Sequence, residues 1–422
     1  MDITIRPSTI NGVLAAPPSK SHGQRALAAA LIRKGKTRIH NFGWSDDERA
    51  ALSVIQNLGA SVQQIAPDSL QIDSSFPDVP LMSNQINCGE SGLSLRMFTP
   101  LAAILPFPVT MSGRGSLLKR PVGFFSDILP RLGVALNTST GGVPMTVEGP
   151  LVPCPLEVDG SLSSQFISGL LMAYSALNAD GVALKVKQLS SRAYVDLTLS
   201  VLRDFNLPCP EVRPEDEFYF SKKVLEPAGD VFDYRVEGDW SNAAFLFVAA
   251  AISGKITLTG LDLFSHQADK RILEALSDCG CGLSIRPESV MVQSAPLNPF
   301  HFDATQCPDL FPPLVALAAY CRGTSVIEGV HRLIHKESNR AATLQSEFEK
   351  LGLSVNLEQD KMIIHGGTLA GGTVFSHQDH RIAMATAVAA LGSKAPVKIT
   401  AAEAISKSYP GFFDDLSAVG AK

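Results

Sequence analysis

The chain has 422 residues, which is too long for one ordinary domain and suits two or three. Its formal net charge is −5, so we expect no nucleic-acid partner and no polybasic membrane contact. The seven cysteines are an odd number without paired spacing, which indicates reduced thiols in a cytoplasmic protein. The first residues do not resemble a signal peptide, and no apolar run reaches the ~18 residues that span a bilayer.

The stretch 17–25, Pro-Pro-Ser-Lys-Ser-His-Gly-Gln-Arg, joins an extended crossing to a helix. Two prolines fix φ and lack an N–H group, so they exclude a helix interior, while residues 26–32 form an apolar helical run. Lys20, Ser21 and Arg25 then cluster at a helix start, which favours anions. A capped helix with two solvated cations is one interpretation. The sharper one is a phosphate or carboxylate site at a domain junction.

One pattern recurs six times, with a period of roughly 70 residues. A helix of small apolar residues leads into a β-rich strand, and a more amphipathic second helix follows. The first helices are expected at 25–32, 94–104, 165–177, 242–252, 311–320 and 381–391, and their strands at 36–39, 109–111, 182–186, 255–258, 324–327 and 397–399. A helix that is apolar on every face is buried on every side. Each copy therefore has one inner helix, one outer helix and several short strands.

The sixth copy lacks closing strands, whereas a strand at 3–5 and an Asn11-Gly12 turn precede the first copy. We expect these N-terminal strands to complete the C-terminal half. The predicted domains are 17–237, and 1–16 together with 238–422. The chain would cross between them at 17–19 and near 237–239. Ligand sites favour such junctions, so the active site is expected in the cleft between the domains.

Cations accompany several of the inner-helix starts. Capping by Ser, Asp or Asn explains part of the polar sequence there. It does not explain Lys20, Arg25 and Arg381, because the positive end of a helix dipole disfavours cations. A bound anion would explain them. Further basic residues stand in loops beside Gly and Pro turns: Lys119, Arg120, Lys336, Arg340 and Lys407.

Other common sites are not indicated. The stretch 377–380, His-Gln-Asp-His, fits no familiar zinc spacing, and a capping Asp beside a packed His is the simpler interpretation. The sequence has neither a Walker A loop nor a dinucleotide fingerprint.

Several motifs together carry a resemblance that covers nearly the whole length. They are 18–25, 119–121, 159–166 and 191–196 in the first half, and 236–239, 308–309, 336–340, 379–384 and 407–410 in the second. They resemble the 5-enolpyruvylshikimate-3-phosphate synthase family, the enolpyruvyl transferases of the shikimate pathway, which leads to chorismate and the aromatic amino acids. The resemblance implies an α/β fold of two inside-out domains, each of three βαβαββ repeats around buried parallel helices, joined by a two-strand hinge.

The resemblance also implies the ligands. Shikimate 3-phosphate would be bound by Lys20, Ser21, Arg25, Ser163, Ser164, Gln165, Ser191, Tyr194, Asp309 and Lys336. Phosphoenolpyruvate would be bound by Lys20, Gly92, Arg120, Gln165, Arg340, Arg381 and Lys407. No metal and no organic cofactor would be needed, and we expect a monomer.

The implied reaction is addition–elimination, in which the 5-hydroxyl of the acceptor attacks C2 of phosphoenolpyruvate while C3 gains a proton. Asp309 could accept the hydroxyl proton. Glu337 and Lys20 are the candidates for proton transfer at C3, and the division between them stays open. A carboxyl group near Lys336 and Arg340 would have a lowered pKa, so Glu337 would need burial or closure to act as an acid.

Four positions depart from the family's usual residues. Glu90 replaces an amide, Leu93 a threonine, Met97 a proline, and Arg332 an asparagine. Glu90 near an anionic substrate should weaken binding unless Arg96 or Arg120 neutralises it, so Glu90→Asn is expected to lower the KM for phosphoenolpyruvate. Leu93 is expected to alter the response to glyphosate, a competitor of phosphoenolpyruvate in this family.

Two alternatives remain open. The first is the enolpyruvyl transferase acting on UDP-N-acetylglucosamine, which generally shows Lys-Asn where this chain has Lys20-Ser21, and a cysteine in the loop that here contains Leu117 and Leu118. The second is a non-catalytic anion-binding relative. Retention of Lys20, Asp309, Glu337 and Arg381 speaks against it.

Overall fold

The computed structural model describes residues 1–78, 80–138, 141–224, 231–334 and 336–422. The chain forms two compact units. One, here called the N-half, is Pro18–Val236, and the other, the C-half, is Met1–Pro17 together with Glu237–Lys422. The chain thus passes between the units twice, after Pro17 and after Val236. No helix in the described part of the chain is long and apolar enough to cross a membrane.

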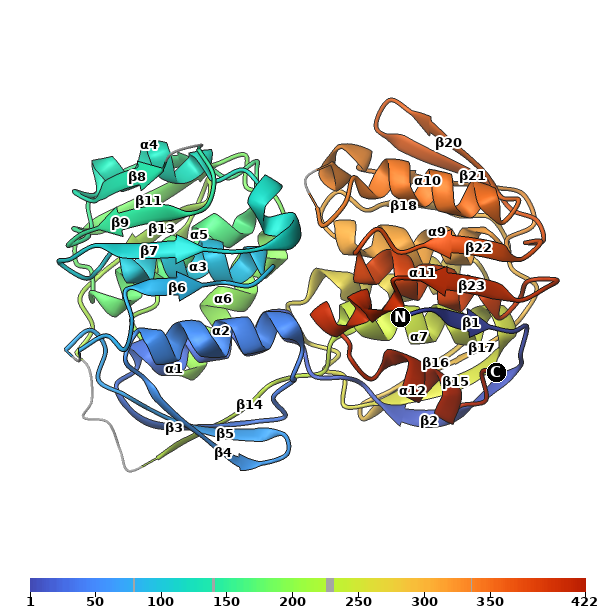
Figure 1. Cartoon of the computed structure of the whole chain (residues 1–422), viewed down its shortest axis with the longest axis horizontal. Helices are drawn as coiled ribbons and strands as arrows, with labels where there is room; N and C mark the ends of the chain where they lie inside the picture. The colour runs from blue at the N-terminus through green and yellow to red at the C-terminus, as the bar shows by residue number, and fades with distance from the viewer. Residues whose placement is uncertain (79, 139–140, 225–230, 335) are drawn as a thin grey trace. The chain divides into compact units, whose positions relative to one another are not determined.

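The N-half surrounds three buried helices with sheets and outer helices (Figure 1). The inner helices are α1 (Lys20–Ile32), α3 (Gly92–Ala102) and α5 (Ser164–Ala176), and nearly all their residues are buried. The outer helices are α2 (Asp46–Asn57), α4 (Gly123–Arg131) and α6 (Arg192–Asp204). The predicted inner and outer helices are therefore present in this unit.

The described strands of the N-half form three four-stranded sheets, each with one parallel pair followed by antiparallel pairs. Their orders are β14-β3-β5-β4, β6-β7-β9-β8 and β10-β11-β13-β12. The bounds are β3 (Gly35–His40), β4 (Ser61–Ala66), β5 (Ser69–Ser74), β6 (Gln85–Asn87), β7 (Val109–Ser112), β8 (Ala135–Thr138), β9 (Met145–Glu148), β10 (Leu156–Asp159), β11 (Val182–Lys187), β12 (Glu211–Arg213), β13 (Glu217–Phe220) and β14 (Phe232–Arg235). A 3-10 helix, η1 (Gly115–Lys119), lies between β7 and α4.

The C-half repeats the arrangement. Its inner helices are α7 (Trp240–Ser253), α9 (Phe311–Ala318) and α11 (His380–Ala390), and its outer helices are α8 (Ile272–Asp278), α10 (Arg340–Lys350) and α12 (Phe412–Ala418). Short 3-10 helices precede or link them: η2 (Ala268–Arg271), η3 (Pro308–Leu310), η4 (Val330–Leu333) and η5 (Ala402–Lys407).

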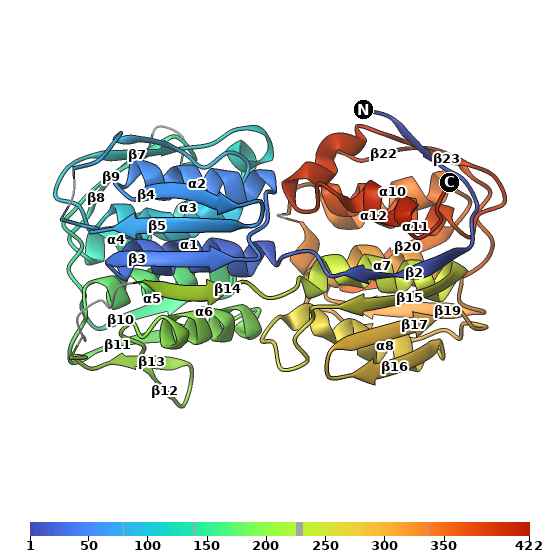
Figure 2. The same cartoon turned by 90° about the horizontal axis from the view of Figure 1, so that it is seen from below.

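The C-half sheets, within the described residues, have the orders β2-β15-β17-β16, β18-β19-β21-β20 and β22-β23-β1 (Figure 2). The bounds are β1 (Ile3–Ile5), β2 (Ile10–Ala15), β15 (Gly254–Thr259), β16 (Gly282–Arg286), β17 (Ser289–Gln293), β18 (His301–Asp303), β19 (Thr324–Glu328), β20 (Ser354–Glu358), β21 (Lys361–His365), β22 (Gly372–Phe375) and β23 (Val397–Thr400).

Among the strands that the structure describes, the N-terminal strands β1 and β2 pair with strands of the C-half. β1 runs antiparallel to β23, with Ile3 opposite Ile399, and β2 runs parallel to β15. At the other crossing, β14 runs parallel to β3 of the N-half. The strand that leads into α1 thus belongs to a C-half sheet, and the strand that leads into α7 belongs to an N-half sheet.

The predicted turn at Asn11-Gly12 is wrong, because both residues lie inside strand β2. The backbone N–H of Asn11 donates to the carbonyl oxygen of Val419 at 2.8 Å. A Cβ atom on Gly12 would lie 2.7 Å from Val419 Cγ1. The glycine is therefore explained by the close approach of the C-terminal segment, not by a turn.

Residues with a left-handed backbone conformation follow the outer helices α2 and α6. Gly59 follows α2 with a φ of 99°, and Asn206 follows α6 with a φ of 53°. Both lie in the left-handed region that these residue types tolerate best. These caps turn the chain from each outer helix back toward the next strand.

Candidate active site

The starts of the three inner helices of the N-half lie together, as the sequence predicts. Gln24 Oε1 of α1 accepts hydrogen bonds from Ser91 Oγ at 3.0 Å and Ser94 Oγ at 2.9 Å, at the start of α3. Arg96 of α3 donates to Gln165 Oε1 of α5 at 2.9 Å. Three positive helix ends therefore share one region, which suits an anion.

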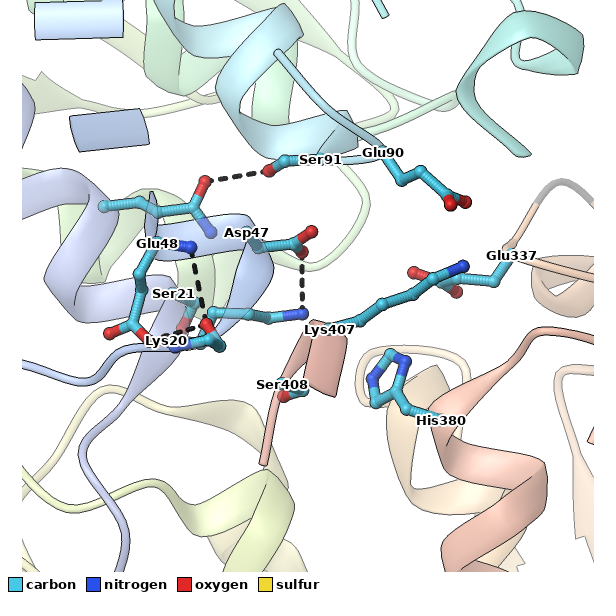
Figure 3. Close-up of polar contacts among 12 residues, drawn as sticks. Lys20, Ser21, Asp47, Glu48, Glu90, Ser91, Glu337, His380, Lys407 and Ser408 are labelled. Carbon is cyan, nitrogen blue, oxygen red and sulfur yellow. Dashed lines mark hydrogen bonds and ion pairs between the residues drawn. The ribbon is translucent and has the colours of Figure 1, made fainter. Parts of the chain in front are cut away.

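Lys20 extends from the first turn of α1 toward α2 (Figure 3). Its ammonium lies 3.0 Å from Asp47 Oδ2, and the two side chains are only 15% and 13% exposed. Asp47 was missed by sequence reasoning, because three acidic residues in the first turn of a helix look like a response to the helix dipole alone. Its contact fixes the position of the Lys20 ammonium.

Gly23 explains how α2 fits against the start of α1. Ser45 and Glu48 form a capping box at the start of α2, and the Glu48 side chain is buried. A Cβ atom on Gly23 would lie 2.9 Å from Glu48 Oε1. The absence of a side chain at Gly23 lets α2, and with it Asp47, approach Lys20.

Arg25 is 1% exposed and lies beneath two of the predicted ligands. It donates to the carbonyl oxygens of Ser21 at 2.7 Å and Tyr194 at 3.2 Å, and to Thr198 Oγ1 at 2.9 Å and Ser168 Oγ at 3.4 Å. These acceptors are neutral, and burial lowers the pKa of Arg25 to about 10. Arg25 thus positions Ser21 and Tyr194. The ligand role that the resemblance implies would require some of these bonds to be exchanged.

Three of the predicted serine ligands lie at the starts of α5 and α6, where two neighbouring loops end. Ser163 caps α5, because its Oγ accepts a hydrogen bond from the backbone N–H of Gln165 at 3.3 Å. Ser164, the first residue of that helix, is buried. Ser191 precedes α6 with a φ of 53°, a strained conformation that is common at functional sites. Ser190 Oγ donates to the carbonyl oxygens of Gly160 and Ser161, at 3.0 Å each, and so joins the two loops.

Arg120 lies against the first residue of α3. A Cβ atom on Gly92 would collide with Nη1 of Arg120, so only glycine leaves room for the guanidinium there. The two predicted phosphoenolpyruvate ligands are therefore in contact. Glu90, two residues earlier, accepts from the backbone amide and the hydroxyl of Ser116, at 3.1 Å each, through Oε2.

Two of the residues that differ from the family's usual ones, Leu93 and Met97, lie on α3 and are buried. Leu93 is 7% exposed and Met97 is fully buried, and both pack in the hydrophobic core of the N-half. Any effect of Met97 on a ligand would thus act through the position of α3. Altered glyphosate sensitivity stays a prediction.

In the C-half, Asp309 is the centre of a cluster of cations. Its Oδ1 accepts from Lys336 Nζ at 3.1 Å and from Arg340 Nη1 at 2.7 Å, and its Oδ2 accepts from Arg381 Nη2 at 3.2 Å. Asp309 lies in η3, just before α9, while Arg381 lies in the first turn of α11. The predicted C-half ligands Lys336, Arg340 and Arg381 thus all contact the fourth, Asp309.

Two further carboxylates hold Arg340, which is 1% exposed. Its Nε donates to Asp379 Oδ2 at 2.8 Å, and its Nη2 donates to Glu337. Asp379 also accepts from Ser338 Oγ at 3.0 Å and from the amide of Arg381 at 3.0 Å. Asp379, which the sequence suggested only as a helix cap, therefore also orients Arg340.

The electrostatics of this cluster keep Asp309 ionised. Burial opposes ionisation, but the charges of Arg381, Lys336 and Arg340 outweigh it and hold the pKa of Asp309 well below its usual range. Burial lowers the pKa of Lys336, against the opposing charge of Asp309. A carboxylate so strongly paired is a poor base until some of these cations move to another anion.

Lys407 and Arg332 are two further basic side chains of this half. Lys407 is 7% exposed and donates from Nζ to the carbonyl oxygen of Gln378 at 2.8 Å. In Figure 3 its side chain extends toward that of Glu337. Burial lowers the pKa of Arg332, whereas the charge of Asp309 raises it, which places Arg332 within electrostatic reach of the cluster.

The charges of these residues suit anions. Within the described ranges, no group of three His, Cys, Asp or Glu side chains could hold a metal ion. Each unit instead brings several cations and hydroxyl groups to the starts of its buried helices. The fold and these two sets of residues define an α/β protein of repeated units in which cations cluster at helix starts, an arrangement that suits small, multiply charged anions.

Comparison with known proteins makes the class specific. The model of the family EPSP synthase (3-phosphoshikimate 1-carboxyvinyltransferase) matches residues 5–416, and this chain belongs to that family. The 3-phosphoshikimate 1-carboxyvinyltransferase of Clostridium kluyveri is 36% identical over 419 residues, covering 99% of this chain and 97% of the relative. That of Clostridium perfringens is 35% identical over 420 residues, covering 99% and 98%.

Solved structures agree. The EPSP synthase from Acinetobacter baumannii superposes with a TM-score of 0.82 at 25% identity, covering 99% of this chain and 98% of that chain. The enolpyruvyl transferase NikO from Streptomyces tendae, at 17% identity and a TM-score of 0.78, shares the fold. The predicted fold class of two inside-out α/β domains is confirmed. The alternative acceptor UDP-N-acetylglucosamine is not favoured.

Proposed function

We propose that this enzyme transfers the enolpyruvyl group of phosphoenolpyruvate to the 5-hydroxyl of shikimate 3-phosphate and releases phosphate. The observation that carries the proposal is the Asp309 carboxylate, which Lys336, Arg340 and Arg381 contact together. When its cations transfer their hydrogen bonds to incoming anions, such a carboxylate becomes a stronger base. The family match over residues 5–416 supports the same reaction.

The acceptor would be bound by the hydroxyl and amide groups of the N-half together with Asp309 and Lys336. Ser21, Ser163, Ser164, Gln165, Ser191 and Tyr194 supply neutral donors, which suit the hydroxyl and phosphate oxygens of shikimate 3-phosphate. Phosphoenolpyruvate would be bound by Lys20, Arg120, Gln165, Arg340, Arg381 and Lys407, with Gly92 leaving space beside Arg120. Arginine forks match carboxylate and phosphate oxygens in pairs.

Substrate binding would activate Asp309. When phosphate and carboxylate oxygens take hydrogen bonds from Lys336, Arg340 and Arg381, the pKa of Asp309 rises toward a value suited to a general base. Asp309 then accepts the 5-hydroxyl proton as the oxygen attacks C2, while Glu337 or Lys20 delivers a proton to C3. The tetrahedral intermediate loses phosphate and the C3 proton and leaves the enolpyruvyl ether.

The two halves would act together in a cleft that closes around both substrates. The anionic substrates bring negative charge between two sets of cations, one on each half, and so favour closure. Closure would exclude water, which favours the charge that develops at C2. It would also supply the burial that Glu337 needs to act as an acid.

We also propose where the enzyme acts and in which oligomeric state. All seven cysteines are free, which supports a cytoplasmic location. We also propose a monomer, for which light scattering would give a mass of 45.0 kDa.

The direct test is phosphate release from phosphoenolpyruvate in the presence and absence of shikimate 3-phosphate. We expect release that depends on the acceptor and that Lys20→Ala abolishes. Lys34→Ala is the matched control, because Lys34 is 54% exposed and pairs with the surface residue Asp78. Release without the acceptor, or with UDP-N-acetylglucosamine in its place, would contradict the proposal.

A further inference from the structure

The segment before Arg120 lies across the loop that starts α3. The amide of Arg114 donates to the carbonyl oxygen of Gly89 at 2.8 Å. Two residues later, the amide and the hydroxyl of Ser116 both donate to Glu90 Oε2, at 3.1 Å each. Three hydrogen bonds therefore join residues 114–116 to residues 89–90, and two of them end on one carboxylate oxygen.

The fit around the Glu90 carboxylate is close. Gly115 has a φ of 56°, which disfavours other residues, and a Cβ atom there would collide with the Glu90 carboxyl group. Leu117, which follows Ser116, is fully buried. The loop backbone is thus packed directly on the carboxylate, which leaves no space for a side chain between them.

This contact determines where Arg120 lies. Ser116 stands four residues before Arg120, and Glu90 stands two residues before Gly92. The Arg120 amide donates to the carbonyl oxygen of Leu117 at 3.2 Å, which continues the η1 turn to the arginine. Fixing Ser116 on Glu90 therefore holds the Arg120 guanidinium against Gly92 at the positive end of α3.

We propose that Glu90 is a positioning residue that anchors η1 through Ser116 and so presents Arg120 to phosphoenolpyruvate. The proposal rests on the proposed function of Arg120 as a ligand. A carboxylate oxygen accepts stronger hydrogen bonds than an amide oxygen does, and an asparagine at this position would be one methylene shorter. The expected effect of Glu90 is thus the reverse of that inferred from sequence: its loss weakens phosphoenolpyruvate binding.

The first measurement is amide hydrogen exchange of η1 in the full-length, substrate-free enzyme. Glu90→Ala should raise the exchange rate of the Ser116 amide about tenfold or more, because its acceptor is lost. Glu90→Gln, which retains an oxygen at the same distance, should raise it less. Glu215→Ala, at an exposed residue of the same half, is the matched control. An unchanged exchange rate in Glu90→Ala would overturn the anchor.

The second measurement is steady-state kinetics with both substrates. We expect Glu90→Ala to raise the KM for phosphoenolpyruvate about tenfold while the KM for shikimate 3-phosphate changes less than about twofold. Glu90→Gln should restore most of the difference. Ser116→Ala removes only the hydroxyl donor, so its effect should be smaller, and combining it with Glu90→Ala should add little.

Two outcomes separate the anchor from the proposed function. If the Ser116 amide exchanges faster in Glu90→Ala but the KM for phosphoenolpyruvate is unchanged or lower, the positioning role is overturned. If Arg120→Ala leaves phosphoenolpyruvate binding unchanged, Arg120 is not a ligand and the functional part of the inference fails with it, whereas the exchange result still decides the anchor. If Glu90→Ala does not fold, Glu90→Gln and Ser116→Ala provide the same comparison.

Discussion

At the scale of single residues, Asp309 shows how one side chain changes role with its surroundings. Three cations contact it and lower its pKa, although its partial burial opposes ionisation. The same cations are the expected ligands of two anionic substrates. The strength of Asp309 as a base is therefore coupled to substrate binding, because each bond that the cations transfer to a substrate raises its pKa.

Replacement of Asp309 by asparagine tests this role. Asp309→Asn keeps the shape but cannot accept a proton, so we expect kcat to fall about 10²- to 10⁴-fold, as measured by phosphate release. Asp278→Asn, at an exposed position at the end of α8, is the control. A kcat within about threefold of the unmodified enzyme would show that another group accepts the proton.

Residue roles were partly predictable from sequence. Lys20, Arg340 and Arg381 stood out because cations at helix starts or in Gly-rich and Pro-rich loops are unusual. Asp47 and Gln24 did not stand out, because their partners lie far along the chain and a helix start explains an acidic or polar residue locally. Arg25 was expected only as a ligand, and its buried bonds to Ser21 and Tyr194 depend on α6, whose packing no local pattern predicts.

At the scale of elements, the inner helices were predicted from their apolar sequence but their starts were less clear. The apolar run was expected from residue 25, with Lys20 and Ser21 at the helix start, and α1 begins at Lys20. Hydrophobic periodicity fails in this first turn because its polar side chains, such as Gln24, find buried partners on α3. Strand β14 was missed for a related reason, since its partner β3 lies far away in sequence.

The buried Glu347 connects outer helix α10 to the start of α11. Its carboxylate accepts from His377 Nε2 at 2.7 Å, from Lys350 Nζ at 2.7 Å and from the amide of Phe375 at 2.9 Å. His377 and Gln378 both have a positive φ, and the Gln378 carbonyl oxygen accepts from Lys407. Glu347 thus supports a strained turn that leads into the candidate site.

Stability of this element should depend on pH. Burial raises the pKa of Glu347, but its hydrogen bonds outweigh burial and lower it. A lowered pKa in the folded state adds stability above the unfolded value of about 4.3, and this stability is lost as the pH falls through the folded value. Glu347→Gln should therefore lower the Tm at pH 7 by about 5 °C, and by less below about pH 4.

Calorimetry at both pH values would measure this difference. Glu349→Gln, exposed on the same helix, should have little effect at either pH. An equal Tm for Glu347→Gln and the unmodified enzyme at pH 7, or a deficit that does not shrink on acidification, would contradict the assigned role of the Glu347 carboxylate.

At the scale of the whole molecule, the six repeats explain how two half-sites arise from one chain. Each unit places the starts of three buried helices together, and each contains a strand that leads into the first helix of the other unit. The sequence repeat predicted the helices and their order. It also led to the expectation that the N-terminal strands complete the C-half, but it could not predict the register, such as Ile3 opposite Ile399 in the pair of β1 and β23.

Closure of the two units is the prediction at this scale. With the Lys20→Ala variant, which should not turn over, small-angle X-ray scattering should show a smaller radius of gyration when both substrates are present than without them. Shikimate without its phosphate serves as the control, because it brings less negative charge. A radius that stays the same with both substrates would contradict closure.

The proposed enolpyruvyl transfer is tested most directly by identifying the products. Nuclear magnetic resonance of a reaction with phosphoenolpyruvate and shikimate 3-phosphate would follow both the ether and the phosphate. We predict one enolpyruvyl ether at the 5-position and one phosphate for each phosphoenolpyruvate consumed. Formation of pyruvate instead of the ether, or no consumption of phosphoenolpyruvate at all, would contradict the proposed transfer.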